Sequence, residues 1–316
     1  MYQPRSRCGK RSPSWRGTAG ANVVAMRSIV LMESTGRVGR SVGLALRRAG
    51  HPLRVLGEGT RPSGPWRFLG GTFVSTSWPI EVQASLLGGV DAAFVGAPNA
   101  WVEGSIAAAE EHADRVLRVL GACRALQRVV VLSSIGAHRD DVGIIEMAAA
   151  LESTVSWLLA PTVFVRPAWY LENWYEPFAV AARTGMLPSV LGPIDRPTPM
   201  VSFHDAAEVV ERLLVGLGGD SRDVIEIEGP TRVTAQETAA LLGVALGRSV
   251  RAVEMSDERV DRVVLERLDG PELIHGWSKM LRAFRRGEVD FEEPGAVVRG
   301  RTTIADVVRG WTERAA

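Results

Sequence analysis

The fold is decided by one stretch near the start of the chain, Ile29-Val-Leu-Met-Glu33-Ser-Thr35-Gly36-Arg37-Val38-Gly39-Arg-Ser-Val-Gly-Leu-Ala-Leu-Arg-Arg-Ala-Gly50-His51. The apolar run 29–32 predicts a buried strand, a turn with two glycines follows, and residues 38–49 have the pattern of a helix that ends at Gly50. Strand, glycine turn and helix form the first unit of a dinucleotide-binding fold, where backbone N–H groups and the helix N-terminus face a pyrophosphate. We therefore expect the cofactor-binding residues of the turn to be Thr35, Gly36, Arg37, Val38 and Gly39.

The first glycine position of this pattern is occupied by Glu33. A carboxylate there would lie close to the phosphates and repel them, so the fold is indicated strongly while the cofactor site is expected to be degraded. NAD(H) and NADP(H) both remain candidate cofactors of such a site. If the cofactor cleft is empty, Glu33 could instead act as a general base.

Composition sets broad limits on what the protein does. The 316 residues include 37 basic and 36 acidic side chains, so the formal net charge is +1 and nothing indicates a nucleic-acid partner. Two cysteines give neither a disulfide framework nor a metal site, and no apolar run has the length of a membrane span. We expect a cytoplasmic protein that binds a small molecule. Both a monomer and a homodimer are compatible with the sequence.

Strand and helix patterns alternate along most of the chain. Apolar runs predict strands at 53–56, 72–75, 91–96, 128–134 and 162–166, with helices between several of them. Such alternation predicts an α/β fold: a doubly wound, Rossmann-type parallel sheet with a smaller C-terminal α/β lobe. We expect a disordered basic leader at 1–25, the Rossmann-type domain at 26–167 and the substrate-binding lobe at 168–316.

An ordered set of short motifs resembles one protein family. The motifs are Ser-Thr35-Gly36-Arg-Val-Gly39, Val131-Leu-Ser-Ser-Ile-Gly-Ala137, Val165-Arg-Pro167, Glu172-Asn173-Trp174, Leu187-Pro188 and Glu228-Gly-Pro230. Together they are similar to the NmrA-like branch of the atypical short-chain dehydrogenase/reductase superfamily. The resemblance implies a Rossmann-type sheet, usually NAD(P), and a substrate pocket under the C-terminal lobe. Members of the family include reductases, enzymes of specialised metabolism and nucleotide-binding regulators.

Several positions depart from the family pattern. Glu58 stands after the second strand, where the family's basic residue would pair with a 2′-phosphate. Glu58 could accept hydrogen bonds from an adenosine ribose and favour NAD, or it could be an exposed loop residue. The ordinary short-chain mechanism needs a Tyr with a Lys four residues on, and neither Lys10 nor Lys279 lies near a tyrosine. Proton delivery would need another group.

Two residues after the fifth strand are candidates for catalysis. His138 follows the strand end and could transfer a proton, although a solvated loop residue beside Arg139 and Asp140 is the preferred interpretation. Ser134 could orient a substrate oxygen or simply cap the backbone. The pair His204 and Asp205 is interpreted as structural, with Asp205 as the N-cap of a helix at 206–216.

Aromatic residues mark the expected substrate site. Trp101 follows the fourth strand, while Trp169, Tyr170 and Asn173 follow the sixth, so all four are expected at the ligand edge of the sheet. Indole surfaces suit flat or apolar ligands, with one N–H that can orient them. The alternative is that these side chains pack the C-terminal lobe onto the sheet, which is the preferred interpretation for Trp174.

Three functions from different classes follow from these observations. The first is a non-redox enzyme of the isomerase, cyclase or lyase type that acts on an aromatic or apolar metabolite of specialised metabolism. The second is an NAD(P)H-dependent reductase of the atypical short-chain type, and the third is a nucleotide-sensing regulatory protein. Glu33, Glu58 and the missing Tyr/Lys pair place the first ahead of the other two.

Overall fold

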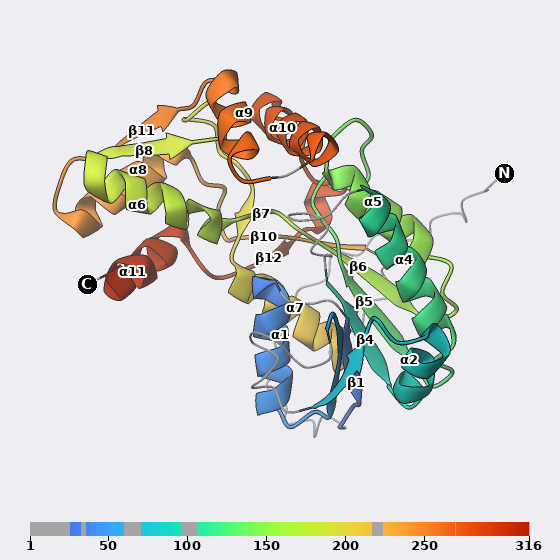
Figure 1. The fold of residues 1–316 in the computed structure, drawn as a ribbon. Helices are drawn as coiled ribbons and strands as arrows, with labels where there is room; N and C mark the ends of the chain where they lie inside the picture. The colour runs from blue at the N-terminus through green and yellow to red at the C-terminus, as the bar shows by residue number, and fades with distance from the viewer. Residues whose placement is uncertain are drawn as a thin grey trace.

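The central layer of the protein is a parallel sheet of eight strands (Figure 1). The computed structural model describes residues 26–32, 36–59, 71–96, 106–216, 224–268 and 270–315. The strands, in their order across the sheet, are β12 (Val298–Arg299), β10 (Val224–Glu228), β6 (Thr162–Pro167), β5 (Arg128–Leu132), β4 (Ala92–Val95), β1 (Ile29–Met32), β2 (Leu53–Gly57) and β3 (Thr72–Ser75). All their pairings are parallel, which confirms the predicted doubly wound α/β fold.

Helices cover both faces of this sheet because successive side chains on each strand point to opposite sides. Ile29 and Leu31 belong to one buried cluster, and Val30 and Met32 to another. The first cluster packs under α1 (Arg37–Arg48) and α7 (Phe203–Leu214). The second packs under α2 (Ile80–Leu87), α4 (Ile106–Gly121) and α5 (Ile145–Val155). Figure 1 shows α1 and α7 on one side of the strands, with α2, α4 and α5 on the other.

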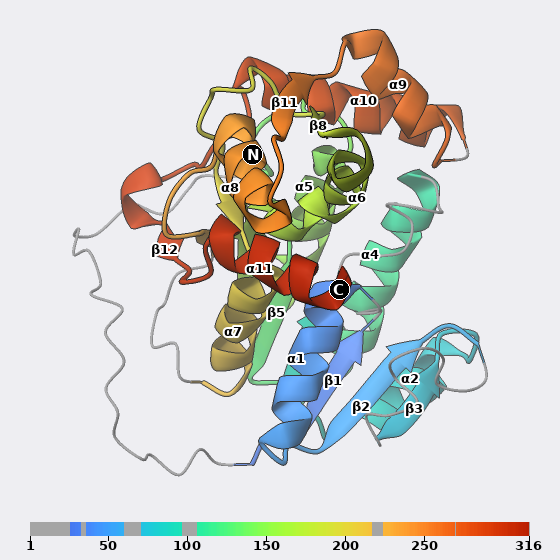
Figure 2. The same ribbon diagram turned by 90° about the vertical axis from the view of Figure 1, so that its left-hand side faces the viewer.

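The remaining elements form a lobe beyond one edge of the sheet (Figure 2). They are β7 (Trp169–Tyr170), the 3-10 turn η2 (Leu171–Trp174), α6 (Tyr175–Thr184), β8 (Met186–Ser189), β9 (Met200–Val201), α8 (Ala235–Leu246), β11 (Arg251–Glu254), α9 (Asp257–Leu265), α10 (Pro271–Arg286), η3 (Pro294–Ala296) and α11 (Ile304–Ala315). Strands β8 and β11 pair in a small parallel sheet of their own. The central sheet also takes β10 and β12 from beyond residue 167, and the domain boundary at that residue stays a prediction.

The segment 257–286 contains two helices, α9 and α10, because Gly270 has a φ of +95° and Pro271 begins α10. One expectation of the sequence analysis, the helix cap at Asp205, is wrong. α7 begins at Phe203, and its N-cap is Ser202, whose hydroxyl accepts a hydrogen bond from the His204 N–H. None of the described helices is long and apolar enough to cross a membrane.

Candidate functional site

The carboxyl edge of the central sheet contains the predicted phosphate turn. β1 lies between β2 and β4. The strands that follow β1 directly, β2 and β3, lie on one side of it, and β4 and β5 lie on the other, so the strand order reverses at β1. Ligands of doubly wound sheets bind at such a switch point. Gly36 is the N-cap of α1 in an extended conformation, and a Cβ built on it has no described atom within 4 Å. The first turn of α1 contains no acidic residue, and no side chain caps it among the described residues. Gly36 and the α1 N-terminus therefore fit the phosphates of a dinucleotide.

Arg37 connects this turn to the lobe. It is the first residue of α1, and its guanidinium lies 5.3 Å from the ring centroid of Phe203 and 5.7 Å from that of Tyr175. Val38 and Gly39 are buried behind it. The partial charge of the helix N-terminus and the charge of Arg37 both make this corner favourable for an anion. Arg37 was expected to contact the cofactor, and its aromatic partners could not be recognised from the sequence.

The end of β2 presents Glu58 to solvent. Its side chain is exposed directly after Gly57, and no described residue forms an ion pair with it. The geometry is compatible with both earlier interpretations, a ribose-binding carboxylate and a surface loop residue. The role of Glu58 therefore stays a prediction.

The end of β5 separates two neighbouring serines. The Ser133 hydroxyl is buried and donates to Glu152 on α5, whereas Ser134 is half-buried and donates only a local bond of 3.1 Å to the Ile135 carbonyl. Ser134 can exchange this local bond for a substrate oxygen. His138 is exposed four residues further on. Both stay candidates, Ser134 to orient a substrate and His138 to transfer a proton.

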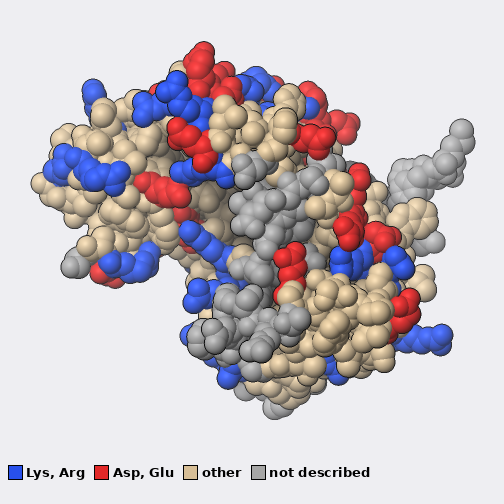
Figure 3. Space-filling view, in the orientation of Figure 1, with Lys and Arg blue, Asp and Glu red and all other residues tan. Residues whose placement is uncertain are grey.

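The end of β6 brings aromatic side chains to the junction of sheet and lobe. Trp169 is half-buried and meets Phe284 of α10 edge-on, with 5.1 Å between the ring centroids. Tyr170 packs on Phe203 at 4.3 Å, and Asn173 is exposed. In the space-filling view the surface is hollowed between the lobe with α6 and the part with α1 (Figure 3). The substrate roles of Trp169, Tyr170 and Asn173 stay predictions, because the contacts of both rings also pack the lobe.

The Glu-Asn-Trp motif has a structural role in this chain. The Glu172 carboxylate accepts the Phe203 N–H at 3.1 Å and the Ser202 hydroxyl at 2.8 Å, so it caps α7 from a distant segment. Burial raises the pKa of Glu172, and these hydrogen bonds act in the opposite direction. Trp174 is 4% exposed, and its N–H lies 3.4 Å from the Met200 sulfur. The preferred packing interpretation of Trp174 agrees with this environment.

The two tyrosines of the described chain are unsuited to the usual proton transfer. Burial raises the pKa of Tyr170 above its ordinary value, with the Glu172 charge as a second cause. The Tyr175 hydroxyl accepts a 2.8 Å hydrogen bond from Arg314. Neither tyrosine has an ammonium partner, because the one lysine of the described residues, Lys279, pairs with Asp141 at 2.5 Å and with Glu146 at 3.6 Å.

A cavity of about 200 Å³ lies near Lys279. It is lined by α4, α5 and α10, and α5 contributes Glu146, Met147 and Ala150. At about 100° per residue, these three positions are on the opposite side of α5 from Glu152, which faces Ser133. Three predicted site residues, Glu33, Thr35 and Trp101, lie outside the described residues.

Comparisons with known proteins agree with this geometry. No family model matches the chain. A sequence relative from Streptomyces griseus, (4-alkanoyl-5-oxo-2,5-dihydrofuran-3-yl)methyl phosphate reductase, is 26% identical over 247 residues, which cover 77% of this chain and 82% of the relative.

Several solved structures have the same fold over nearly their whole length. The NADPH-dependent quinone oxidoreductase QOR2 of Escherichia coli, in complex with NADPH, matches with a TM-score of 0.71 and 18% identity over 89% of this chain and 99% of its own. The Citrobacter triphenylmethane reductase complexed with NADP(H) matches with a TM-score of 0.74 and 14% identity, over 90% of this chain and 99% of its own. The negative transcriptional regulator NmrA in complex with NAD matches with a TM-score of 0.64 and 17% identity, over 90% of this chain and 91% of its own.

Proposed function

We propose that this chain, whose fold is that of the NmrA-like atypical short-chain dehydrogenases/reductases, is a nicotinamide-dependent reductase of a conjugated, electron-poor small molecule. The observation that carries the proposal is the open Gly36 N-cap of α1 at the switch point of the sheet. Gly36 and the start of α1 leave room for a phosphate, although the tyrosine–lysine pair of the ordinary mechanism is missing. A helix N-terminus that can bind phosphate, without an evident proton donor beside it, suits hydride transfer to an acceptor that needs little help from an acid.

Conjugated acceptors are suited to such a site for a chemical reason. Addition of hydride to a quinone or to an unsaturated 1,3-dicarbonyl gives an anion delocalised over oxygen, and addition to a triphenylmethane cation gives a neutral product. Protonation can then come from solvent or from an exposed histidine. Orientation of the reactants can by itself supply roughly 7–11 kcal/mol of a barrier, so binding in the correct geometry is the main task of the protein.

The residues of the chain divide this task. A bound nicotinamide dinucleotide would supply the hydride. Gly36 and the α1 N-terminus would hold its phosphates, and Arg37 would add charge at the same corner. Ser134 would donate a hydrogen bond to the oxygen of the acceptor that gains negative charge, and Trp169 would contact its flat face. His138 would return a proton at the solvent-exposed end.

The relatives support the class of acceptor. The matched proteins include reductases of a quinone, of triphenylmethane dyes and of a dihydrofuranone that carries an alkanoyl group. These three acceptors are conjugated and electron-poor. The similarity to the solved structures concerns the fold, so the choice among such acceptors for this chain is part of the proposal.

Nucleotide titration and turnover test the proposal together. Purified protein should bind NADH or NADPH in calorimetry. It should also oxidise the nucleotide, seen as a fall in absorbance at 340 nm, when 1,4-benzoquinone, a triphenylmethane dye or a 3-acylbutenolide is added. Ser134→Ala should lower kcat about tenfold to a hundredfold through the lost donor. Binding of neither nucleotide would reject the reductase proposal.

A second candidate is the non-redox enzyme of the isomerase, cyclase or lyase type. Two acidic residues favour it, because Glu33 occupies a glycine position of the phosphate-turn pattern and Glu58 follows β2, where the family has a basic residue. It predicts no nucleotide binding and turnover without added cofactor. A third candidate is a nucleotide-sensing regulator, because the fold is also similar to that of NmrA in complex with NAD. This candidate predicts that the protein binds the nucleotide but reduces no acceptor.

A further inference from the structure

A buried polar network lies directly behind the end of β5. Arg166 on β6 binds Glu152 on α5 through two hydrogen bonds, Nε to Oε1 at 2.8 Å and Nη2 to Oε2 at 2.6 Å. The same guanidinium donates from Nη1 to Glu292 at 2.8 Å. The Ser133 hydroxyl donates to Oε1 of Glu152. The side chains of Arg166 and Glu152 are 6% and 11% exposed, so the pair lies almost entirely away from water.

The position of this network matters more than its energy. A buried ion pair often contributes no more to stability than well-packed apolar residues of similar volume, because both charges must be desolvated. Its hydrogen bonds, however, have fixed directions, and they end on the residue next to Ser134. The network can therefore define the orientation of that strand end.

The backbone explains how Ser133 can act on Ser134. The strand end stays attached to β6, since Ser133 donates its N–H to the Val165 carbonyl at 2.7 Å and Ile135 donates to Pro167 at 3.0 Å. In extended backbone, neighbouring side chains point to opposite sides. Fixing the Ser133 hydroxyl on Glu152 therefore leaves Ser134 directed away from α5.

The other end of the network holds the lobe. Glu292 belongs to residues 288–293, here called the covering segment. Val289 of this segment packs so closely on Gly136 that a Cβ at Gly136 would lie 2.9 Å from it. Glu226 of β10 accepts the N–H groups of Glu292 and Glu293 at 3.0 and 3.1 Å, and these bonds attach the covering segment to the central sheet. One arginine thus binds both the carboxylate behind Ser133 and the segment that covers the following loop.

We infer that Glu152 is a positioning residue, which acts through Ser133 to aim the Ser134 hydroxyl at the acceptor, and that Arg166 couples this alignment to the covering segment. The inference rests on the proposed function for its catalytic consequence. Its structural consequence, an ordered strand end at residues 133–137, can be measured without any substrate.

The experiment compares Ser133→Ala and Glu152→Gln with a matched control, Arg232→Met. Arg232 binds Asp290 in the same covering segment at 3.0 and 2.8 Å but does not contact the strand end. Amide hydrogen exchange is followed at Ile135 and Ala137, and kcat and KM are measured with NADH and 1,4-benzoquinone. Ser133→Ala removes a single hydroxyl, so the test remains available if Glu152→Gln does not fold.

We expect Ser133→Ala and Glu152→Gln to speed exchange at Ile135 and Ala137 and to lower kcat about tenfold, with the KM for NADH unchanged, because the donor is misaligned while the phosphate turn is intact. Arg232→Met should speed exchange in the covering segment and near Glu228 of β10, its second ion-pair partner at 3.3 Å, but not at Ile135 and Ala137. Unchanged exchange at residues 133–137 would overturn the inference, as would faster exchange with a wild-type kcat. If the wild-type protein has no reductase activity, the proposed function fails, and the exchange data alone decide whether Glu152 orders the strand end.

Discussion

The guanidinium of Arg37 lies over the ring of Phe203, 5.3 Å from its centroid. Arg37 is the first residue of α1 and Phe203 is the first residue of α7, so this contact joins the starts of two helices that are far apart in the sequence. Phe203 in turn packs on Tyr170 after β6. The phosphate turn and the aromatic junction with the lobe are therefore in contact, and a change at one should be felt at the other.

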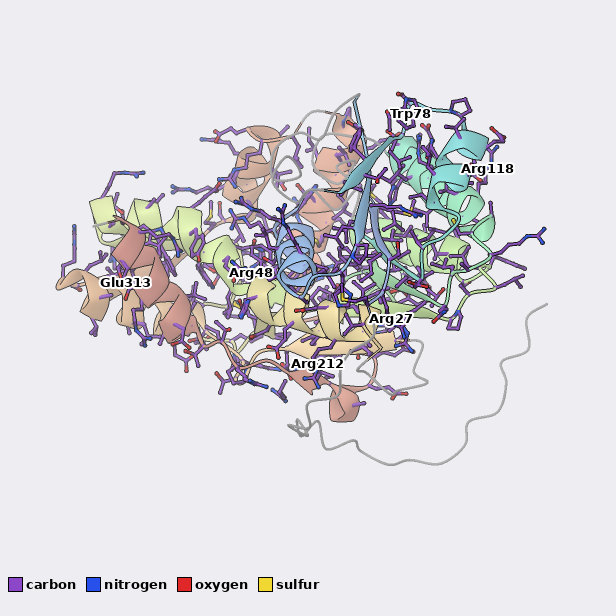
Figure 4. The ribbon with its side chains drawn as sticks, turned by 90° about the horizontal axis from the view of Figure 1, so that it is seen from below. Arg27, Arg48, Trp78, Arg118, Arg212 and Glu313 are labelled. Carbon is purple, nitrogen blue, oxygen red and sulfur yellow. The ribbon has the colours of Figure 1, made fainter. Side chains whose placement is uncertain are left out.

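Replacing Arg37 tests this contact. Arg37→Ala removes a cation from two aromatic rings, and exposed contacts of this kind contribute about 0.5–1 kcal/mol. We expect a small fall in the free energy of unfolding and a severalfold weaker affinity for NADH, measured by denaturation and calorimetry. Arg48→Ala is the control, since Arg48 stands at the other end of α1 (Figure 4). Equal losses of NADH affinity in the two variants would show that overall charge, and not this contact, is responsible.

Replacing Glu33 tests the degraded phosphate turn. Glu33→Gly should raise the affinity for NAD(P)H about tenfold, because removal of a repulsion of about 1.4 kcal/mol changes a dissociation constant by that factor. The gain should shrink at high salt, where exposed charges are screened. Calorimetry at low and high ionic strength provides the measurement. A dissociation constant that is the same in both proteins would mean that the carboxylate turns away from the phosphates.

Two tryptophans should respond differently to truncation. Trp174→Ala should destabilise the fold by about 3–5 kcal/mol, because it empties a buried site in the core. Trp101→Ala should impair ligand binding or turnover while the melting temperature stays near that of the wild type. Thermal denaturation and steady-state kinetics of both variants separate the two roles. A Trp101 variant that only melts earlier would assign this residue to packing.

His51 gives the unfolding free energy a predictable dependence on pH. Its side chain is 7% exposed, and its Nδ1 accepts the Arg27 N–H at 3.2 Å. Burial is the main cause that lowers its pKa below 6.5, with the nearby Arg27 charge acting in the same direction. The unfolded chain therefore binds a proton at a higher pH than the folded protein does, and stability present above pH 6.5 is lost as pH falls through the folded pKa. Urea denaturation between pH 8 and pH 5 should show this loss, and His51→Asn should reduce it. An identical pH dependence in the variant would exclude His51 as its source.

The sequence predicted the central sheet well because its signals are local. Residues 29–32 and 72–75 are strands with the expected bounds, and Thr234, a residue type favoured at N-caps, caps the helix over 235–246. Apolar runs and capping residues act within a few positions of themselves, so single-sequence patterns contain them. Asp205 shows where this fails. Its carboxylate accepts the N–H groups of Arg301 and Thr302 at 3.0 and 2.9 Å. These partners are almost a hundred residues away in the sequence, so no local pattern predicts them.

The sequence by itself determined the class of the protein: a parallel α/β sheet, a glycine turn followed by a helix, and the absence of the tyrosine–lysine pair. Only the tertiary structure decided which side chains meet. It placed Arg37 over Phe203, used Glu172 to cap α7, and connected Ser133 through Glu152 and Arg166 to Glu292. The reason is physical. Secondary structure follows from short-range periodicity and capping, whereas hydrogen bonds and ring contacts between distant segments exist only once the strands have been ordered in the sheet and the lobe has packed against its edge.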